Sequence, residues 1–359
     1  MIYKWLVPAW QQLLAQRTTL HHALLIHGPA GIGKSAFADE LARSLLCESP
    51  LPDGAACGRC SACGWFAQGN HPDFRRLAPA SVEEGGDSDA GAGAGEEPAG
   101  KAGGPSGSKS GGRSGSKPSR DIRIDQVRAL ERFTEVGGHR GATRIVLIDP
   151  GDAMNAAAAN ALLKTLEEPS GGTRFVLVTD RPDALPATIR SRCRTLALSL
   201  PPADEAAAWL AADVGVDLAQ ARAWLAAAGG APLRARRFAD PAQAAIHRLV
   251  VETVAGLPET GVVQAADALA DVPPAIWVAT LQAWVVDLQR VCVGAPPRYF
   301  PDRAERLGAL ARRAGLAALD RLAARLDRSA RAVDHPLNPR LMVEDALLDV
   351  RAALTARAV

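Results

Sequence analysis

The stretch GPAGIGKS, residues 28–35, contains the glycines, the lysine and the hydroxyl group that a phosphate-binding loop requires. It fits the pattern G-x-x-x-x-G-K-[ST] at every fixed position, after an apolar run and before a helical pattern. Glycines let the backbone turn tightly, so that its N–H groups face phosphate oxygens. We therefore predict an ATP and Mg²⁺ site, with Lys34 reaching the β- and γ-phosphates and the Ser35 hydroxyl on the metal. The residues expected to bind are Gly28, Gly31, Gly33, Lys34 and Ser35.

The apolar run VLID ends in Asp149, which has the place of a Walker B aspartate that holds Mg²⁺ directly or through water. Hydrolysis also needs a group that positions the attacking water, usually a carboxylate, and the next residue is Pro150. Asp152 is a possible substitute base, but we expect it to cap the following helix instead. The sequence therefore predicts nucleotide binding without competent hydrolysis.

Four cysteines are spaced C-x9-C-x2-C-x2-C, and this spacing lets their thiolates converge on one ion. Four sulfur ligands leave no open position, so structural Zn²⁺ is favoured over an iron–sulfur cluster or free thiols. His71 is nearby, and a role in the turn before Pro72 is favoured over a role as a fifth ligand. Cys193 and Cys292 lie in apolar settings and are expected to be buried thiols. The expected zinc ligands are Cys47, Cys57, Cys60 and Cys63.

Apolar runs that predict strands alternate with helical patterns over the first 200 residues. The expected strands are 22–28, 73–79, 143–149, 174–180 and 194–200. The expected helices are 34–47, 122–136 and 153–169. Continuous apolar strands alternating with helices predict an α/β fold, in which helices cover both faces of a parallel sheet.

The remaining sequence predicts an all-α part and one insertion, so that three domains are expected. Residues 81–120 are rich in Gly and Ser and cannot offset their ordering entropy, which predicts a disordered insertion, either a solubilising loop or a docking tail. The nucleotide-binding domain would cover residues 1–200, with the zinc module at 47–63. A helical lid would cover 201–242 and a C-terminal helical bundle 243–359, where apolar side chains recur at steps of three and four.

Composition narrows the class of protein. The 359 residues are 48% apolar and 4% aromatic, and the net charge of +2 gives no strong field that would attract nucleic acid. No long apolar run predicts a membrane span, and the first residues lack the apolar block of a signal peptide. We therefore expect a cytoplasmic protein whose cysteines are thiols or metal ligands.

Several motifs together resemble the clamp-loader subunits of bacterial DNA polymerase III, which are AAA+ proteins. The resemblance is specific over residues 20–200, and the C-terminal segment HPLNPRLMVEDALL, residues 335–348, looks like the collar of this family. The motifs that carry it are the phosphate loop, the four cysteines, NHPDF, IDQVR, NALLKTLEEP and TIRSRC.

The resemblance implies roles for three further residues. Arg192, the arginine of S-R-C, corresponds to an arginine finger that one subunit offers to its neighbour's nucleotide; Arg190 and Arg194 are the alternatives. Such a finger stabilises the charge that develops in phosphoryl transfer. Thr179 has the sensor-1 position at a strand end. Arg234 has the sensor-2 position in the lid, although a solvated helix arginine is an equally good interpretation.

Two kinds of family member are candidates, and Pro150, the chain length and the collar motif favour the delta-prime kind over the gamma or tau motor. The delta-prime interpretation implies a five-subunit ring with motor and delta subunits, which loads the sliding clamp onto primer-template DNA. The alternatives are an autonomous gamma-like ATPase and, in another class, a DNA-binding protein that uses its zinc module.

Overall fold

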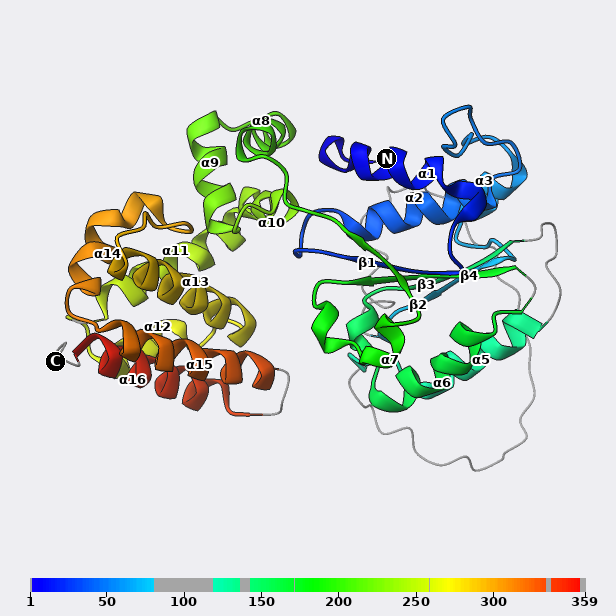
Figure 1. Ribbon diagram of the computed structural model, residues 1–359. Helices are drawn as coiled ribbons and strands as arrows, with labels where there is room; N and C mark the ends of the chain where they lie inside the picture. The colour runs from blue at the N-terminus through cyan, green and yellow to red at the C-terminus, as the bar shows by residue number, and fades with distance from the viewer. Residues whose placement is uncertain are drawn as a thin grey trace, which may run out of the picture. The chain divides into compact units, whose positions relative to one another are not determined.

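The computed structural model describes residues 2–80, 119–135, 143–170, 172–257, 259–333 and 337–355. The chain divides into two compact units, Met1–Pro29 with Gly33–Ser199, and Ala30–Ile32 with Leu200–Val359. The insertion predicted over 81–120 lies outside the described residues, except for its last two. Figure 1 shows the helices and strands of each unit.

A five-stranded sheet forms the centre of the first unit, and every strand pair in it is parallel. The order across the sheet is β2-β3-β4-β1-β5, so β4 lies between β3 and β1. The strands are β1 (Ala23–His27), β2 (Phe74–Leu77), β3 (Arg144–Ile148), β4 (Thr173–Thr179) and β5 (Arg194–Ala197). The predicted parallel sheet is therefore confirmed. Four strands are shorter than their apolar runs, and β4 has the predicted length but begins one residue earlier.

Helices cover both faces of this sheet. In Figure 1, α1, α2 and α3 lie on one face and α5, α6 and α7 on the other. These helices are α1 (Val7–Ala15), α2 (Lys34–Leu46), α3 (Ser61–Ala67), α5 (Ile124–Glu135), α6 (Ala156–Glu167) and α7 (Ala187–Arg190). The α1 helix was not expected; it packs Trp10 edge-on against Phe37 of α2, with the ring centres 5.4 Å apart. Both faces are buried, which explains the continuous apolar strands.

Helix α6 begins three residues later than the pattern predicted. A 3₁₀ turn, η3 (Gly151–Ala153), precedes it, and the Asn155 side chain caps the helix by accepting a hydrogen bond of 2.8 Å from the Ala158 N–H. The prediction that Asp152 caps this helix was therefore wrong. Asn155 is as good a cap as aspartate, and its extended backbone stands directly before Ala156, the first helical residue.

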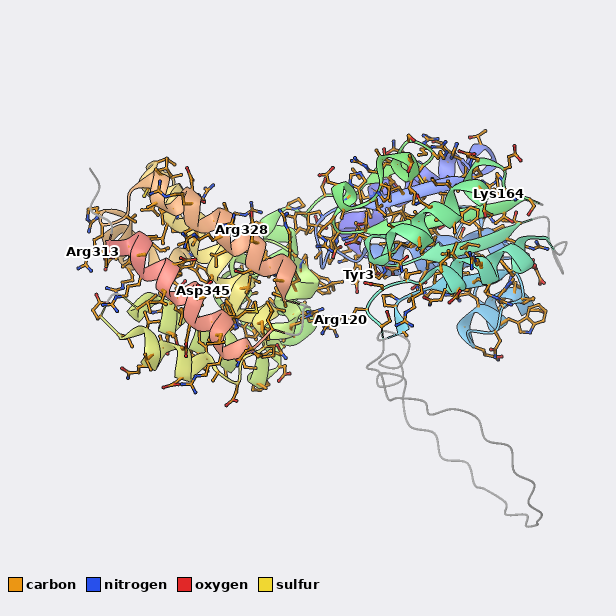
Figure 2. All side chains as sticks on the ribbon, turned by 90° about the horizontal axis from the view of Figure 1, so that it is seen from below. Tyr3, Arg120, Lys164, Arg313, Arg328 and Asp345 are labelled. Atoms are coloured by element: carbon orange, nitrogen blue, oxygen red, sulfur yellow. The ribbon has the colours of Figure 1, made fainter. Side chains whose placement is uncertain are left out.

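The second unit is helical in its described residues. Three short helices share a small core of alanine and leucine: α8 (Ala203–Val214), α9 (Leu218–Ala227) and α10 (Pro232–Arg236). A larger bundle follows, with α11 (Pro241–Gly256), α12 (Val262–Leu269), α13 (Pro274–Cys292), α14 (Ala304–Ala311), α15 (Leu316–Ala332) and α16 (Pro339–Thr355). Arg328 on α15 and Asp345 on α16 are labelled in Figure 2.

The bundle core is built around α13. Trp277, Leu281, Trp284 and Leu288 are fully buried, and Val291 packs against them, so the apolar stripe read from the sequence is core. Nowhere in the described ranges is a helix long and apolar enough to cross a membrane. The division of this unit into lid and collar stays a prediction.

Candidate functional site

The phosphate loop joins β1 to α2, and all three of its glycines have positive φ angles that other residues rarely adopt. Gly31 has φ +80° and Gly33 has φ +97°, both in the left-handed region. A side chain at Gly33 would also place its Cβ 2.5 Å from the Tyr3 ring. Helix α2 begins directly at Lys34, so its free N–H groups face the loop, as anion binding requires. The glycines and the helix start therefore fit a bound phosphate chain.

Lys34 is 5% exposed, and its ammonium group already has two partners in the first unit. It donates a hydrogen bond of 2.6 Å to the Pro29 carbonyl oxygen and forms an ion pair with Asp180. Asp180 directly follows β4 and is about half exposed. The lysine is thus held at the carboxyl edge of the sheet, where nucleotides bind in folds of this class.

Ser35 and Asp149 come together as the predicted magnesium site requires. The exposed Ser35 side chain lies close enough to the Asp149 carboxylate to favour its charged form. Burial raises the pKa of Asp149, while Ser35 and the charge of Arg76 act in the opposite direction. A hydroxyl and a carboxylate are the two protein ligands that P-loop proteins offer to Mg²⁺, so this pair fits that ion.

Thr179, the sensor-1 candidate, is fully buried and its hydroxyl is committed to another residue. It donates a hydrogen bond of 2.8 Å to Oδ1 of Asp152 and accepts one of 3.0 Å from the Arg181 N–H. The other oxygen of Asp152 accepts a bond of 2.9 Å from Nε of Arg181. Both oxygens of Asp152 are therefore occupied, which speaks against this carboxylate as a substitute base.

Arg192, the finger candidate, follows α7 and has a side chain that is 35% exposed. Its Nε donates a hydrogen bond of 2.7 Å to Glu167, and another guanidinium nitrogen donates one of 2.9 Å to the Thr188 carbonyl oxygen. Glu167 belongs to the motif NALLKTLEEP, in which Lys164 projects from α6 at the surface (Figure 2). The ion pair between Arg192 and Glu167 thus joins TIRSRC to NALLKTLEEP, two of the motifs that carry the resemblance.

The two alternatives to Arg192 have other surroundings. Arg190 donates a hydrogen bond of 2.9 Å to Asp183, which is 93% exposed. Arg194 is exposed and begins the edge strand β5. Three arginines of like charge within five residues therefore offer matched positions for comparison.

The four predicted metal ligands converge. The sulfur atoms of Cys47, Cys57, Cys60 and Cys63 all lie within 4.8 Å of one another, and those of Cys47 and Cys60 are 3.8 Å apart. Zinc–sulfur bonds of about 2.3 Å in a tetrahedron place the sulfurs about 3.8 Å apart, so this cluster has the size of a metal site. Backbone N–H groups of Arg59 and Cys60 lower the pKa of Cys57 to about 6, which favours the thiolate.

His71 does not belong to this cluster. It is 4% exposed, its Nδ1 accepts a hydrogen bond of 3.1 Å from the Asp73 N–H, and burial lowers its pKa. The bond lies within the turn before β2, as expected for a turn residue. Cys193 and Cys292 are half-buried, where full burial was expected. Burial raises the pKa of Cys193 to about 11, so this thiol stays protonated at neutral pH.

Arg234, the sensor-2 candidate, lies on α10 beside Gly31, and both residues belong to the second unit. The Leu233 N–H donates a hydrogen bond of 3.0 Å to the Gly31 carbonyl oxygen. A side chain at Gly31 would place its Cβ 2.5 Å from Cγ of Arg234. Glycine is therefore required at residue 31 both by the backbone angle and by this neighbour.

A protein family described as "DNA polymerase III, delta subunit" matches residues 5–202, which is more than half of the chain. The chain belongs to this family. The match covers the whole sheet, the phosphate loop, the cysteine cluster and Arg192. The predicted resemblance to clamp-loader subunits is thereby confirmed.

Individual relatives of the chain also carry names of DNA polymerase III subunits. The protein named DNA polymerase III subunit delta′ from Pseudomonas aeruginosa is 40% identical over 238 residues, which are 66% of this chain and 61% of that protein. The one from Escherichia coli is 34% identical, over 64% of this chain and 58% of that protein. Subunit tau from Salmonella typhimurium is 31% identical, over 48% of this chain and 21% of that protein. The chain thus matches less than two thirds of the length of these relatives.

Three residues around the family's motifs were missed from the sequence. Glu167 holds Arg192, Asp180 holds Lys34, and Arg181 pairs with Asp152. The signal was present for Asp180 and Arg181, because they directly follow Thr179 at the end of a predicted strand. Their partners, Lys34 and Asp152, could not be assigned from the sequence, because these residues lie on other elements.

Proposed function

We propose that this chain serves as a delta-prime-like subunit of a DNA polymerase III clamp loader. It would assemble with motor and delta subunits into a five-subunit ring that loads the sliding clamp onto primer-template DNA. The family match and the names of its relatives support this proposal. The family match over residues 5–202 covers the elements of the first unit that hold the site residues described above.

The chain would bind ATP with Mg²⁺ and hydrolyse it poorly or not at all. Lys34, Ser35 and Asp149 would hold the phosphates and the metal, and Gly28, Gly31 and Gly33 would shape the loop. Thr179 and Arg234 would act as the two sensor residues that the resemblance implies. A bound nucleotide would contribute charge and order to the loop. Pro150 follows Asp149 where a water-positioning glutamate would be needed, and Asp152 is occupied by Thr179 and Arg181.

One observation carries the proposed contribution to catalysis, namely the fixed and partly exposed guanidinium of Arg192. Glu167 and the Thr188 carbonyl leave part of it open to a neighbouring subunit. An arginine supplied in trans to a nucleotide is worth about 10³- to 10⁵-fold in rate in well-studied GTPases. We infer that the chain lends this charge to a motor subunit.

The cysteine cluster would hold a structural Zn²⁺ ion. Four sulfurs leave no position for water or substrate, so the ion would stabilise the segment between α2 and α3 and would not act on a substrate. Cys47 ends α2 and Cys63 lies in α3, so the metal would join two helices of the first unit.

Reconstitution tests the proposed function. Purified tau and delta subunits would be mixed with this chain, and the complex separated by size-exclusion chromatography and assayed for DNA-stimulated clamp loading. We expect a stable complex that loads clamps only when this chain is present, and no steady-state ATP hydrolysis by the chain alone. Turnover by the isolated chain that Lys34→Ala abolishes would favour the gamma-like motor instead.

A further inference from the structure

We propose that Asp180 and Asp152 take the place of a terminal phosphate, so that the site favours a nucleoside diphosphate over a triphosphate. The inference rests on the proposed nucleotide binding and specifies which nucleotide the site prefers. It concerns the two groups that would contact a γ-phosphate, Lys34 and Thr179, both of which lie in the first unit.

The partner of Lys34 is a carboxylate where a phosphate oxygen would be expected. The lysine is almost fully buried, and its charge is balanced by Asp180 and by the Pro29 carbonyl. A phosphate group must displace Asp180 or share the lysine with it. Because Asp180 is half exposed, it can be displaced, and its negative charge then remains close to the incoming phosphate.

The partner of Thr179 is likewise a carboxylate. A hydroxyl has a single proton to donate, and Thr179 donates it to Asp152. One of the two lone pairs on this oxygen is also used, because the Arg181 N–H donates to it. Arg181 also pairs with Asp152 and holds its carboxylate in place. Thr179 therefore cannot donate to a phosphate unless this network rearranges.

The position of β4 brings the two pairs to the same part of the site. The strand lies between β3, which Asp149 follows, and β1, which leads into the phosphate loop. Thr179 is the register partner of His27, the last residue of β1. A third phosphate would extend toward this strand end and meet the two carboxylates. A diphosphate would end before the end of β4 and would keep its contacts with the N-terminus of α2.

Isothermal titration of the full-length chain with MgATP and with MgADP tests the proposal. We expect the unmodified chain to bind MgADP more tightly than MgATP. Asp180→Asn keeps the size of the side chain and removes its charge, and should tighten MgATP binding about fivefold, with a smaller change for MgADP. Asp183→Asn is the matched control. It removes the same charge three residues after Asp180, and the Asp183 carboxylate pairs with Arg190 and not with Lys34.

A second variant separates the two carboxylates. Asp152→Ala should free the Thr179 hydroxyl and further shift the preference toward MgATP; circular dichroism and thermal melting show whether it is folded. If Asp180→Asn and Asp183→Asn change the MgATP to MgADP ratio equally, or if neither the unmodified chain nor Asp180→Asn binds a nucleotide, the proposal is wrong. The clamp-loading assay does not depend on either result, so failure here is distinguishable from failure of the proposed function.

Discussion

Removal of the metal from the cysteine cluster should destabilise the first unit by an amount that follows from the structure. The metal would cross-link Cys47 at the end of α2 to Cys63 in α3, closing a segment of 17 residues, counted from 47 to 63. By analogy with a disulfide, a cross-link over such a loop contributes about 3 kcal/mol. In a unit of this size each kcal/mol shifts the melting temperature by about 2–4 °C, so a loss of about 6–12 °C is expected.

The loss should be partial because the segment is also held by contacts that do not need the metal. Arg17 donates a hydrogen bond of 3.1 Å to the Gly54 carbonyl oxygen, and the Ser44 hydroxyl donates one of 2.6 Å to the same oxygen. The second unit has its own core around α13 and no cysteine of the cluster. Its transition should therefore remain unchanged.

Differential scanning calorimetry, with and without a zinc chelator, measures both transitions. Elemental analysis of the same sample should give about one zinc per chain. Cys60→Ser should reproduce the effect of the chelator, whereas Cys193→Ser, outside the cluster, should leave the chelator effect intact. A metal-free purified chain, or a chelator that moves neither transition, would refute the assignment; iron with its colour would point to an iron–sulfur cluster.

Two further predictions concern stability. Asp287 is fully buried and accepts hydrogen bonds of 2.6, 2.9 and 2.8 Å from the N–H groups of residues 298–300. Asp287→Ala should therefore lower the free energy of unfolding of the second unit by about 4 kcal/mol, measured in urea. A loss no larger than that of the exposed control Asp327→Ala would contradict this prediction. Asn155→Ala should lower the stability of the first unit by about 1 kcal/mol, because the Ala158 N–H loses its cap, whereas Asn155→Asp should be nearly neutral.

The sheet could be predicted from the sequence because its strands are buried on both faces. All five residues of β3 are buried, and such runs stand out from the surrounding helical patterns. The phosphate loop and the cysteine cluster could also be predicted, because their chemistry requires fixed spacing along the chain. The α1 helix could have been found as well, since Trp10 and Leu13 have helical spacing and are buried.

The side-chain pairs around the phosphate loop could not be predicted from the sequence. Lys34 and Asp180 are far apart in the sequence, and their pairing depends on β4 lying beside β1. The error over Asp152 has a local cause. Two good capping residues stand three positions apart, and only the 3₁₀ turn between β3 and α6 decides that Asn155 is the cap. Asp152 is thereby left to pair with Arg181.

The proposed role of Arg192 is tested by the rate of ATP hydrolysis by a reconstituted clamp loader that contains the Arg192→Ala chain. We predict normal assembly and a rate at least about 10²-fold lower at the motor site that this chain faces, measured in a single turnover. Arg194→Ala, which removes the same charge two residues away, should have little effect. An unchanged rate with Arg192→Ala, or an equal loss with Arg194→Ala, would contradict the claim that this chain lends Arg192 to its neighbour.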